Sequence, residues 1–277
     1  MIYLLLDSAS DCNLDGKTGY EFVPITVSMN GMDYLDGINL DKDTFYDILV
    51  HSEEFPKTSQ PSPQAFLELF ERIRDNRDEL IYFALSSALS GTYQSAMIAK
   101  EMAGYDGIYL VDSLLATHGI KILADHAEQM RAAGASAEEI VKSCEELKER
   151  IRIVAAVDTL EYLYRGGRLS RGAAAVGKFA GVKPTITVSP EGTVAVIGKN
   201  LGRGKAMQHI LKIVSGVKRD ERFPMNTLFS CGEENCAELE KKLREAGYDL
   251  DSRLQIGPTI GAHVGPGAYG VLFVARD

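Results

Sequence analysis

Short apolar runs alternate with longer segments of helical periodicity through the first half of the chain. The runs at 2–6, 81–85 and 107–113 have the length and composition of buried strands. Helical periodicity starts at Pro63, directly after the capping residue Ser62. Strands that alternate with helices in this way favour a parallel sheet with right-handed crossover connections.

The pattern changes in the second half of the chain. Residues 183–198 alternate in hydrophobicity around Pro190–Gly192 and are expected to form a hairpin. A helix and then a strand–helix–strand unit follow, which together predict a smaller α+β domain. We therefore predict an α/β protein of two domains: an N-terminal parallel-sheet α/β domain at 1–154, with an irregular insertion near 15–57, and an α+β domain at 155–277.

Polar residues stand at the carboxyl ends of three expected strands. They are Asp7 and Ser8, then Ser86 and Ser87 with Ser90, and then Asp112 and Ser113. The carboxyl ends of parallel strands meet at one edge of a sheet, and ligands of such sheets bind beyond that edge. These residues therefore predict one shared cleft.

Composition and charge narrow the classes of function. With 277 residues, of which 45% are hydrophobic, the chain can bury a sizeable core. Its formal net charge of −9 argues against nucleic acid as the main partner, because phosphate backbones bind basic surfaces. No apolar run approaches the roughly 18 residues of a membrane span, and the first run is too short for a signal peptide. We therefore expect a cytoplasmic protein.

Three stretches resemble known binding motifs but lack residues that those motifs require. Asp11–Gly16 resembles the start of a calcium loop, but Phe22 occupies the position of the bidentate glutamate. Gly265–Gly270 matches a dinucleotide pattern, but the sequence leaves no room for the helix and acidic residue that it requires. Lys199–Ala206 resembles a P-loop fragment but lacks its first glycine and its hydroxyl. We expect no metal and no cofactor.

Residues 81–102 form a strand that runs into a helix through several hydroxyl residues and Gly91. The N–H groups and the dipole of a helix start favour an anion, and Ser90 adds a hydroxyl donor. The flanking residues are apolar rather than basic, which favours the carboxylate of a hydrophobic ligand over a phosphate. Thr58 and Ser59 form a second hydroxyl-rich helix entry. A local role for Ser90 as a helix cap is the alternative.

His263 lies in an apolar, glycine-rich stretch, where its imidazole can hydrogen-bond to a buried oxygen or serve a purely structural role. Ser90 lies in a strand-to-helix turn, as the nucleophiles of many hydrolases do. The nucleophile-elbow pattern G-x-S-x-G is absent, because Ala88 and Thr92 occupy the glycine positions. A serine-dependent acyl hydrolase therefore remains an open alternative.

Six segments, in order along almost the whole chain, together resemble the DegV family. They are KTSQPSP (57–63), SSALSGTYQSA (86–96), VDSLLATHG (111–119), DTLEYLYRGGRLS (158–170), GVKPTITVSPEGTV (181–194) and HVGPGAYGV (263–271). Any one of these segments alone is a weak signal, whereas the combination is specific.

The resemblance implies positions for the carboxylate of a bound acid. Thr58 and Ser90 would hold it, with Ser59 beside Thr58. His263 would hydrogen-bond nearby and support Thr58, and Gly91 would let a backbone amide approach. The resemblance implies no catalytic residue.

Two further sets of residues match the family more loosely. Arg168 and Ser170 belong to a family signature and are expected to have only a structural or rim role. The basic residues Lys199, Arg203 and Lys205 resemble the region that faces a kinase, with a solvated helix start as the alternative.

The resemblance also implies a function. Members of the family bind one long-chain fatty acid between the two domains, and some present its carboxylate to a separate fatty acid kinase subunit, which makes an acyl phosphate. The implied protein is a lipid-binding carrier in phospholipid metabolism, not an enzyme, with no cofactor beyond its bound fatty acid. Its implied partners are the fatty acid and the kinase subunit, and transient contact with a membrane surface is compatible with this role. The alternatives are the hydrolase and a carrier of another lipid with no kinase partner.

Overall fold

The computed structural model describes residues 1–14, 16–169 and 181–276. Its N-terminal part is built on a four-stranded sheet in which every neighbouring pair of strands is parallel. The strand order is β2 (Tyr20–Val23), β1 (Ile2–Asp7), β6 (Glu79–Ala84) and β7 (Ile108–Asp112). The predicted parallel sheet is therefore confirmed.

Helices cover both faces of this sheet. On one face lie α2 (Pro63–Asp75) and α3 (Thr92–Ala103), and on the other lie α4 (His118–Ala132) and α5 (Ala137–Lys148). The side chain of Ser62 accepts a hydrogen bond from the backbone N–H of Ala65, which confirms its predicted role as the N-cap of α2.

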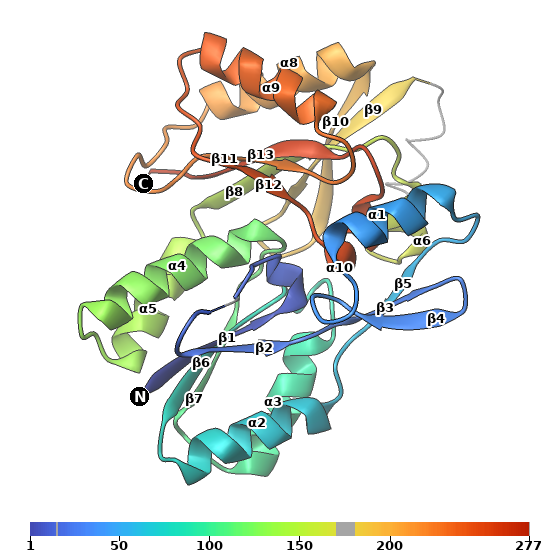
Figure 1. Cartoon of the computed structure of the whole chain (residues 1–277). Coiled ribbons are helices and arrows are strands. Elements are labelled where there is room, and N and C mark those ends of the chain that lie inside the picture. The colour runs from blue at the N-terminus through green and yellow to red at the C-terminus, as the bar shows by residue number, and fades with distance from the viewer. Residues whose placement is uncertain (15, 170–180, 277) are drawn as a thin grey trace.

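The second sheet has six strands of mixed direction. Their order is β10 (Val194–Leu201), β9 (Val182–Val188), β8 (Ile151–Ala156), β13 (Tyr269–Val274), β11 (Asn226–Phe229) and β12 (Arg253–Gln255). All neighbours pair antiparallel except β11 and β12. The helices α8 (Arg203–Ser215) and α9 (Glu234–Glu245) cover its outer face, at the top of Figure 1.

The insertion folds into a small unit of its own. Its strands β4 (Met32–Leu35), β3 (Thr26–Met29) and β5 (Lys57–Ser59) form an antiparallel sheet, and α1 (Lys42–His51) follows β4. The helix α10 (Pro258–Val264), from the C-terminal part of the chain, packs against this unit through Ala262. Figure 1 shows α1 and α10 side by side at the right of the molecule, and the short helix α6 (Glu161–Arg165) lies below α1.

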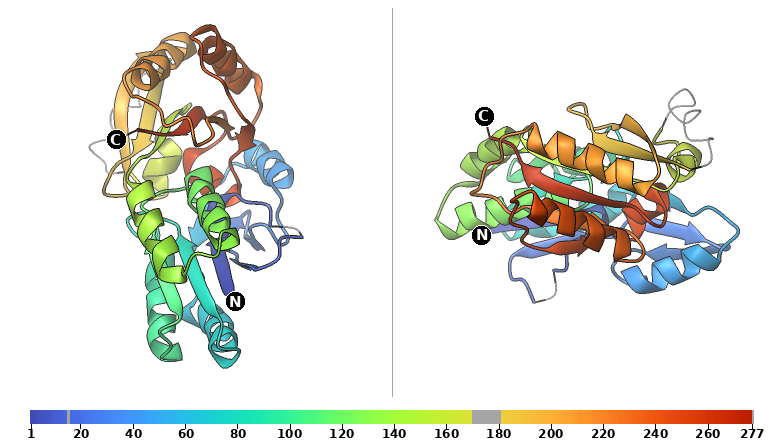
Figure 2. Two further views of the ribbon diagram at one scale, coloured as in Figure 1. Left: turned by 90° about the vertical axis from the view of Figure 1, so that its left-hand side faces the viewer. Right: turned by 90° about the horizontal axis from the view of Figure 1, so that it is seen from above.

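The two sheets share one hydrophobic core. Helices α4 and α5 contact the four-stranded sheet and also meet Ile153, Leu228 and Leu272 from the underside of the six-stranded sheet. Figure 2 shows these helices between the two halves of the molecule. We propose the loop between α5 and β8 as the domain boundary, because β8 belongs to the second sheet from Ile151 onward, whereas the expected boundary at residue 154 lies inside it.

Candidate functional site

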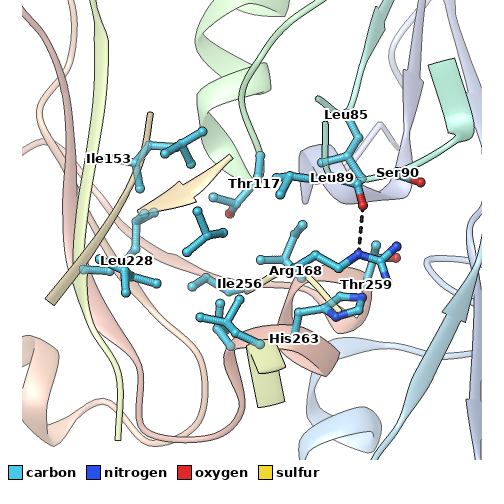
Figure 3. Close-up of a pocket in the computed structure, with 18 of the residues that line it drawn as sticks. Leu85, Leu89, Ser90, Thr117, Ile153, Arg168, Leu228, Ile256, Thr259 and His263 are labelled. Atoms are coloured by element: carbon cyan, nitrogen blue, oxygen red, sulfur yellow. Dashed lines mark hydrogen bonds between the residues drawn. The ribbon is translucent and has the colours of Figure 1, made fainter. Parts of the chain in front are cut away.

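A cavity lies between the two halves of the molecule, and the segments that follow β6 and β7 contribute to its wall. Its walls are mostly aliphatic side chains from both halves, and the space between them is about 820 Å³ including the open mouth. Figure 3 shows Ile153 and Leu228 at one end of this cavity and Ser90, Arg168 and His263 at the other. The cavity therefore has an apolar tail end and a polar head end.

Buried hydrogen bonds fix the loop that carries Ser90. The carboxylate of Asp7 accepts bonds from the backbone N–H of Leu85 at 2.9 Å and from the hydroxyl of Tyr82 at 2.6 Å. Burial raises the pKa of Asp7 to about 6. The loop then turns into α3, where the hydroxyls of Ser90 and Thr92 are hydrogen-bonded at 2.8 Å.

Thr58 and His263 meet at the head end although they lie 205 residues apart in the sequence. Oγ1 of Thr58, on β5, and Nε2 of His263, on α10, form a 2.8 Å hydrogen bond. Nδ1 of His263 is buried and has no hydrogen-bond partner among the described residues. Burial, and secondly the charge of Arg168, lower the pKa of His263 to about 4, so its imidazole is neutral near pH 7.

Arg168, from the second half of the chain, links the two halves at the head end by a hydrogen bond. Its Nε donates a 2.8 Å hydrogen bond to the carbonyl of Leu89, drawn as the dashed line in Figure 3, and Nη1 donates to the carbonyl of Gly166 at 2.6 Å. Burial lowers the pKa of the guanidinium, but the group remains charged. We call Thr58, Ser90, Arg168 and His263 the head cluster: it offers hydroxyls, a neutral imidazole and one cation to an anionic group.

Comparison with known proteins identifies the family. The family model described as "Uncharacterised protein, DegV family" matches residues 1–276. The chain belongs to the DegV family. A DegV domain-containing protein of Caldanaerobacter subterraneus subsp. tengcongensis is 39% identical over 277 residues, which cover 98% of each chain.

Solved structures of other DegV proteins share the fold. A structure of a Thermus thermophilus DegV family protein, described by its fatty acid binding, has a TM-score of 0.88 and 30% identity, with 99% of each chain covered. A stearic acid-binding protein from Eubacterium ventriosum has a TM-score of 0.87 and 27% identity, covering 99% of this chain and 98% of that chain. The predicted two-domain α/β architecture is confirmed for this DegV protein.

Two further residues predicted for the carboxylate site of this DegV protein, Ser59 and Gly91, are not part of the head cluster. Ser59 is exposed and does not line the cavity. Gly91 precedes α3, where a methyl group on it would overlap with the side chain of Gln60. Ser170 lies outside the described residues.

The predicted kinase-facing residues do not line the cavity. Lys199 lies on β10, and Arg203 and Lys205 lie in the first turn of α8; all three are exposed. Arg203 donates a 2.7 Å hydrogen bond to the side chain of Asn235.

A second buried polar group was not predicted from the sequence. Asp36 of the insertion accepts hydrogen bonds from the backbone N–H of Thr259 at 3.0 Å and from its hydroxyl at 2.5 Å. The hydroxyls of Ser8 and Thr259 also lie within hydrogen-bond distance, at 3.1 Å. We call Ser8, Asp36 and Thr259 the Asp36 cluster. Its residues are distant in the sequence and carry no motif, so only the tertiary fold reveals it.

Two other kinds of feature are absent from the described residues. Within residues 1–14, 16–169 and 181–276, no three His, Cys, Asp or Glu side chains come together in a way that could hold a metal ion. No helix in the same ranges is both long and apolar enough to cross a membrane.

Proposed function

We propose that this DegV protein binds one long-chain fatty acid in the cavity between its two halves. The observation that carries the proposal is the division of the cavity into an aliphatic tail end and the head cluster. The related Thermus and Eubacterium proteins, described by their binding of fatty acid, support the same ligand class.

We propose that the carboxylate lies against Thr58, Ser90 and His263, with Ser59 and Gly91 at the edge of this site. A hydroxyl donor next to a neutral imidazole can bind a carboxylate without adding a second charge to a buried site. The positive charge of Arg168 favours the ionised acid, because opposite charges attract strongly where water is excluded.

The tail supplies most of the binding free energy in this proposal. Burying about 15 methylenes contributes roughly 12 kcal/mol. Association costs on the order of 4–15 kcal/mol. The head cluster then determines which end of the acid faces solvent, and the cavity walls determine which chains fit.

The protein acts as a carrier in this proposal. It presents the carboxylate to a separate kinase subunit in the cytoplasm, with Lys199, Arg203 and Lys205 at the contact, and the acyl phosphate enters phospholipid metabolism. Contact with a membrane surface is transient and serves to exchange fatty acid. The support for the kinase role is the family resemblance and the lack of a phosphate-binding loop in the sequence, which leaves the phosphoryl donor to a partner.

The hydrogen bonds at the head end favour a carrier over an acyl hydrolase. A hydrolase would need Ser90 to be activated by a base, but the hydroxyl of Ser90 bonds to Thr92 and the imidazole of His263 bonds to Thr58. A carrier of another lipid without a kinase partner is distinguished by the identity of the bound molecule.

Native mass spectrometry of the purified protein tests the proposal. We expect a mass excess of one molecule per chain, which disappears on denaturation and which an organic extract identifies as a long-chain fatty acid. An apo mass that does not change after incubation with fatty acids would contradict it. A different lipid in the extract would support the other carrier.

A further inference from the structure

A second, wider cleft adjoins the head end of the cavity. Thr58, Arg168 and His263 line both spaces and form their shared boundary. The cleft has about 1360 Å³ of space, which includes open solvent. A group joined to a carboxylate that is held at Thr58 and His263 therefore extends into this cleft.

Side chains from both halves of the chain form the outer wall of the cleft. The rings of Phe55, before β5, and Tyr162, on α6, pack with their centroids 4.7 Å apart. The guanidinium of Arg165 lies over the ring of Phe55, 4.2 Å from its centroid, and pairs with Glu161 at 2.7 Å. Stacking and pairing together hold the planar guanidinium in one orientation beside the cleft.

The charges in the cleft favour an anion. Three cations, Lys57, Arg165 and Arg168, line it together with the carboxylates of Glu53 and Glu54, and Arg165 is also paired with Glu161. Lys57 is exposed and makes no ion pair with any described residue, so its ammonium group is available. Arg168 likewise makes no ion pair with any described residue, so the cleft offers two such cations on a chain whose net charge is −9.

We infer that this cleft is a phosphoryl subsite, in which Arg165 and Lys57 bind the phosphoryl group of an acyl phosphate while its acyl chain occupies the cavity. The inference rests on the proposed function. In the step concerned, a carboxylate oxygen forms a bond to the terminal phosphorus of a nucleoside triphosphate held by the kinase. The bond from that phosphorus to its bridging oxygen breaks and a nucleoside diphosphate leaves. The carboxylate is ionised, so no proton is transferred.

The subsite has a specific physical task in this scheme. Phosphorylation replaces a monoanionic carboxylate by a larger and more highly charged group, and the cleft beside Thr58 and His263 has space for it. Arg165 offers a planar set of N–H donors suited to phosphate oxygens, and Lys57 adds a mobile point charge. The product is thereby held on the carrier with its reactive group in the cleft.

Binding of a stable analogue of the acyl phosphate tests the proposed subsite without the kinase. The probe is a 2-oxoalkylphosphonate, in which a methylene replaces the bridging oxygen of the acyl phosphate, compared with the fatty acid of the same chain length. Delipidated protein is titrated with each ligand by calorimetry. The variant Arg165→Gln is compared with Arg244→Gln on α9. Arg165 and Arg244 have side chains 54% and 57% exposed, and each pairs with a glutamate four residues earlier.

We expect the wild type to bind both ligands. Arg165→Gln should weaken binding of the phosphonate about tenfold, because it removes a charge-assisted hydrogen bond. It should change binding of the fatty acid by less than about twofold, and Arg244→Gln should change neither. Lys57→Gln should weaken phosphonate binding in the same selective way, and it replaces Arg165→Gln if that variant does not fold.

Three outcomes would overturn the inference. One is a wild-type protein that binds the fatty acid but not the phosphonate. Another is equal phosphonate affinity in the wild type and in both cleft variants. The third is an equal loss of both ligands in a folded cleft variant. A wild-type protein that binds neither ligand would instead contradict the proposed function, and the inference with it.

Discussion

The head cluster and the Asp36 cluster are both buried polar groups that join distant parts of the chain, but their hydrogen bonds differ. In the Asp36 cluster the carboxylate, both hydroxyls and the backbone N–H of Thr259 bond to one another. Both clusters border the apolar cavity, which Thr259 also lines, but in the head cluster Nδ1 of His263 has no hydrogen-bond partner among the described residues. A buried cluster whose hydrogen-bonding groups are paired with one another stabilises the fold, whereas a cluster with an unpaired group beside a cavity is suited to binding a ligand.

Replacing Asp36 should have the largest effect on stability. Asp36→Ala leaves the N–H of Thr259 buried without its acceptor and breaks the hydroxyl network, which should lower the free energy of unfolding by about 4 kcal/mol. Asp33→Ala is the control, because Asp33 is exposed and its side chain bonds to Ser28 in an exposed pair. Urea unfolding of the apo proteins measures both changes. A loss for Asp36→Ala no larger than that for Asp33→Ala would show that the cluster is not structural.

His263 should make stability depend on pH in a defined direction. Its pKa in the folded protein is lowered from 6.5 to about 4, so the unfolded chain takes up the proton at a higher pH than the folded one. The stabilisation from its neutral form is complete above pH 6.5 and is lost as the pH falls to about 4. Protonation at low pH should therefore cost the wild type about 3 kcal/mol that a His263→Gln variant does not lose.

The measurement is the difference in unfolding free energy between wild type and His263→Gln at pH 7 and at pH 4. Asp7, whose pKa is raised to about 6, acts in the opposite direction but is present in both proteins and cancels from the difference. A difference that stays constant between the two pH values would mean that His263 is not held neutral by its surroundings.

Ser90→Ala should affect ligand binding more than folding. Loss of the hydroxyl should weaken fatty-acid binding about tenfold, which corresponds to ~1.4 kcal/mol, and should reduce acyl phosphorylation accordingly. The free energy of unfolding should change less, because Ser90 is only half-buried and its hydroxyl bonds to the adjacent Thr92. Ser87→Ala, in the same loop but exposed, is the matched control. Equal phosphorylation of wild type and Ser90→Ala would reject the anchoring role.

Local signals explain which parts of the fold could be predicted from the sequence. The cap at Ser62 and the turn at Pro190–Gly192 act within a few residues, so their helix and hairpin were predicted correctly. The strand Arg253–Gln255 was missed because its three residues form a strand only by pairing with β11. The helix Pro258–Val264 was missed because it is only seven residues long and is flanked by glycines at both ends.

The head cluster shows the same limit for a site. Family resemblance singled out Thr58 and His263, but no spacing in the sequence indicates that residues 205 positions apart form a hydrogen bond. Arg168 was expected at most at a rim, and its bond to the carbonyl of Leu89 depends on how the two halves of the chain pack. Pairings between distant segments are properties of the tertiary structure, so they require coordinates.

The smallest effect is expected at the basic surface of β10 and α8. Replacing Lys199, Arg203 and Lys205 together by glutamine should leave fatty-acid affinity unchanged, because all three are exposed and none lines the cavity. It should raise the KM of the kinase for the loaded carrier about threefold, since exposed charges at an interface act mainly on association. Raising the salt concentration should reduce the difference between wild type and variant, because screening weakens the same attraction. Unchanged kinase kinetics at low salt would show that the kinase contacts another surface. The head cluster and its cleft would then remain the features that a partner must reach.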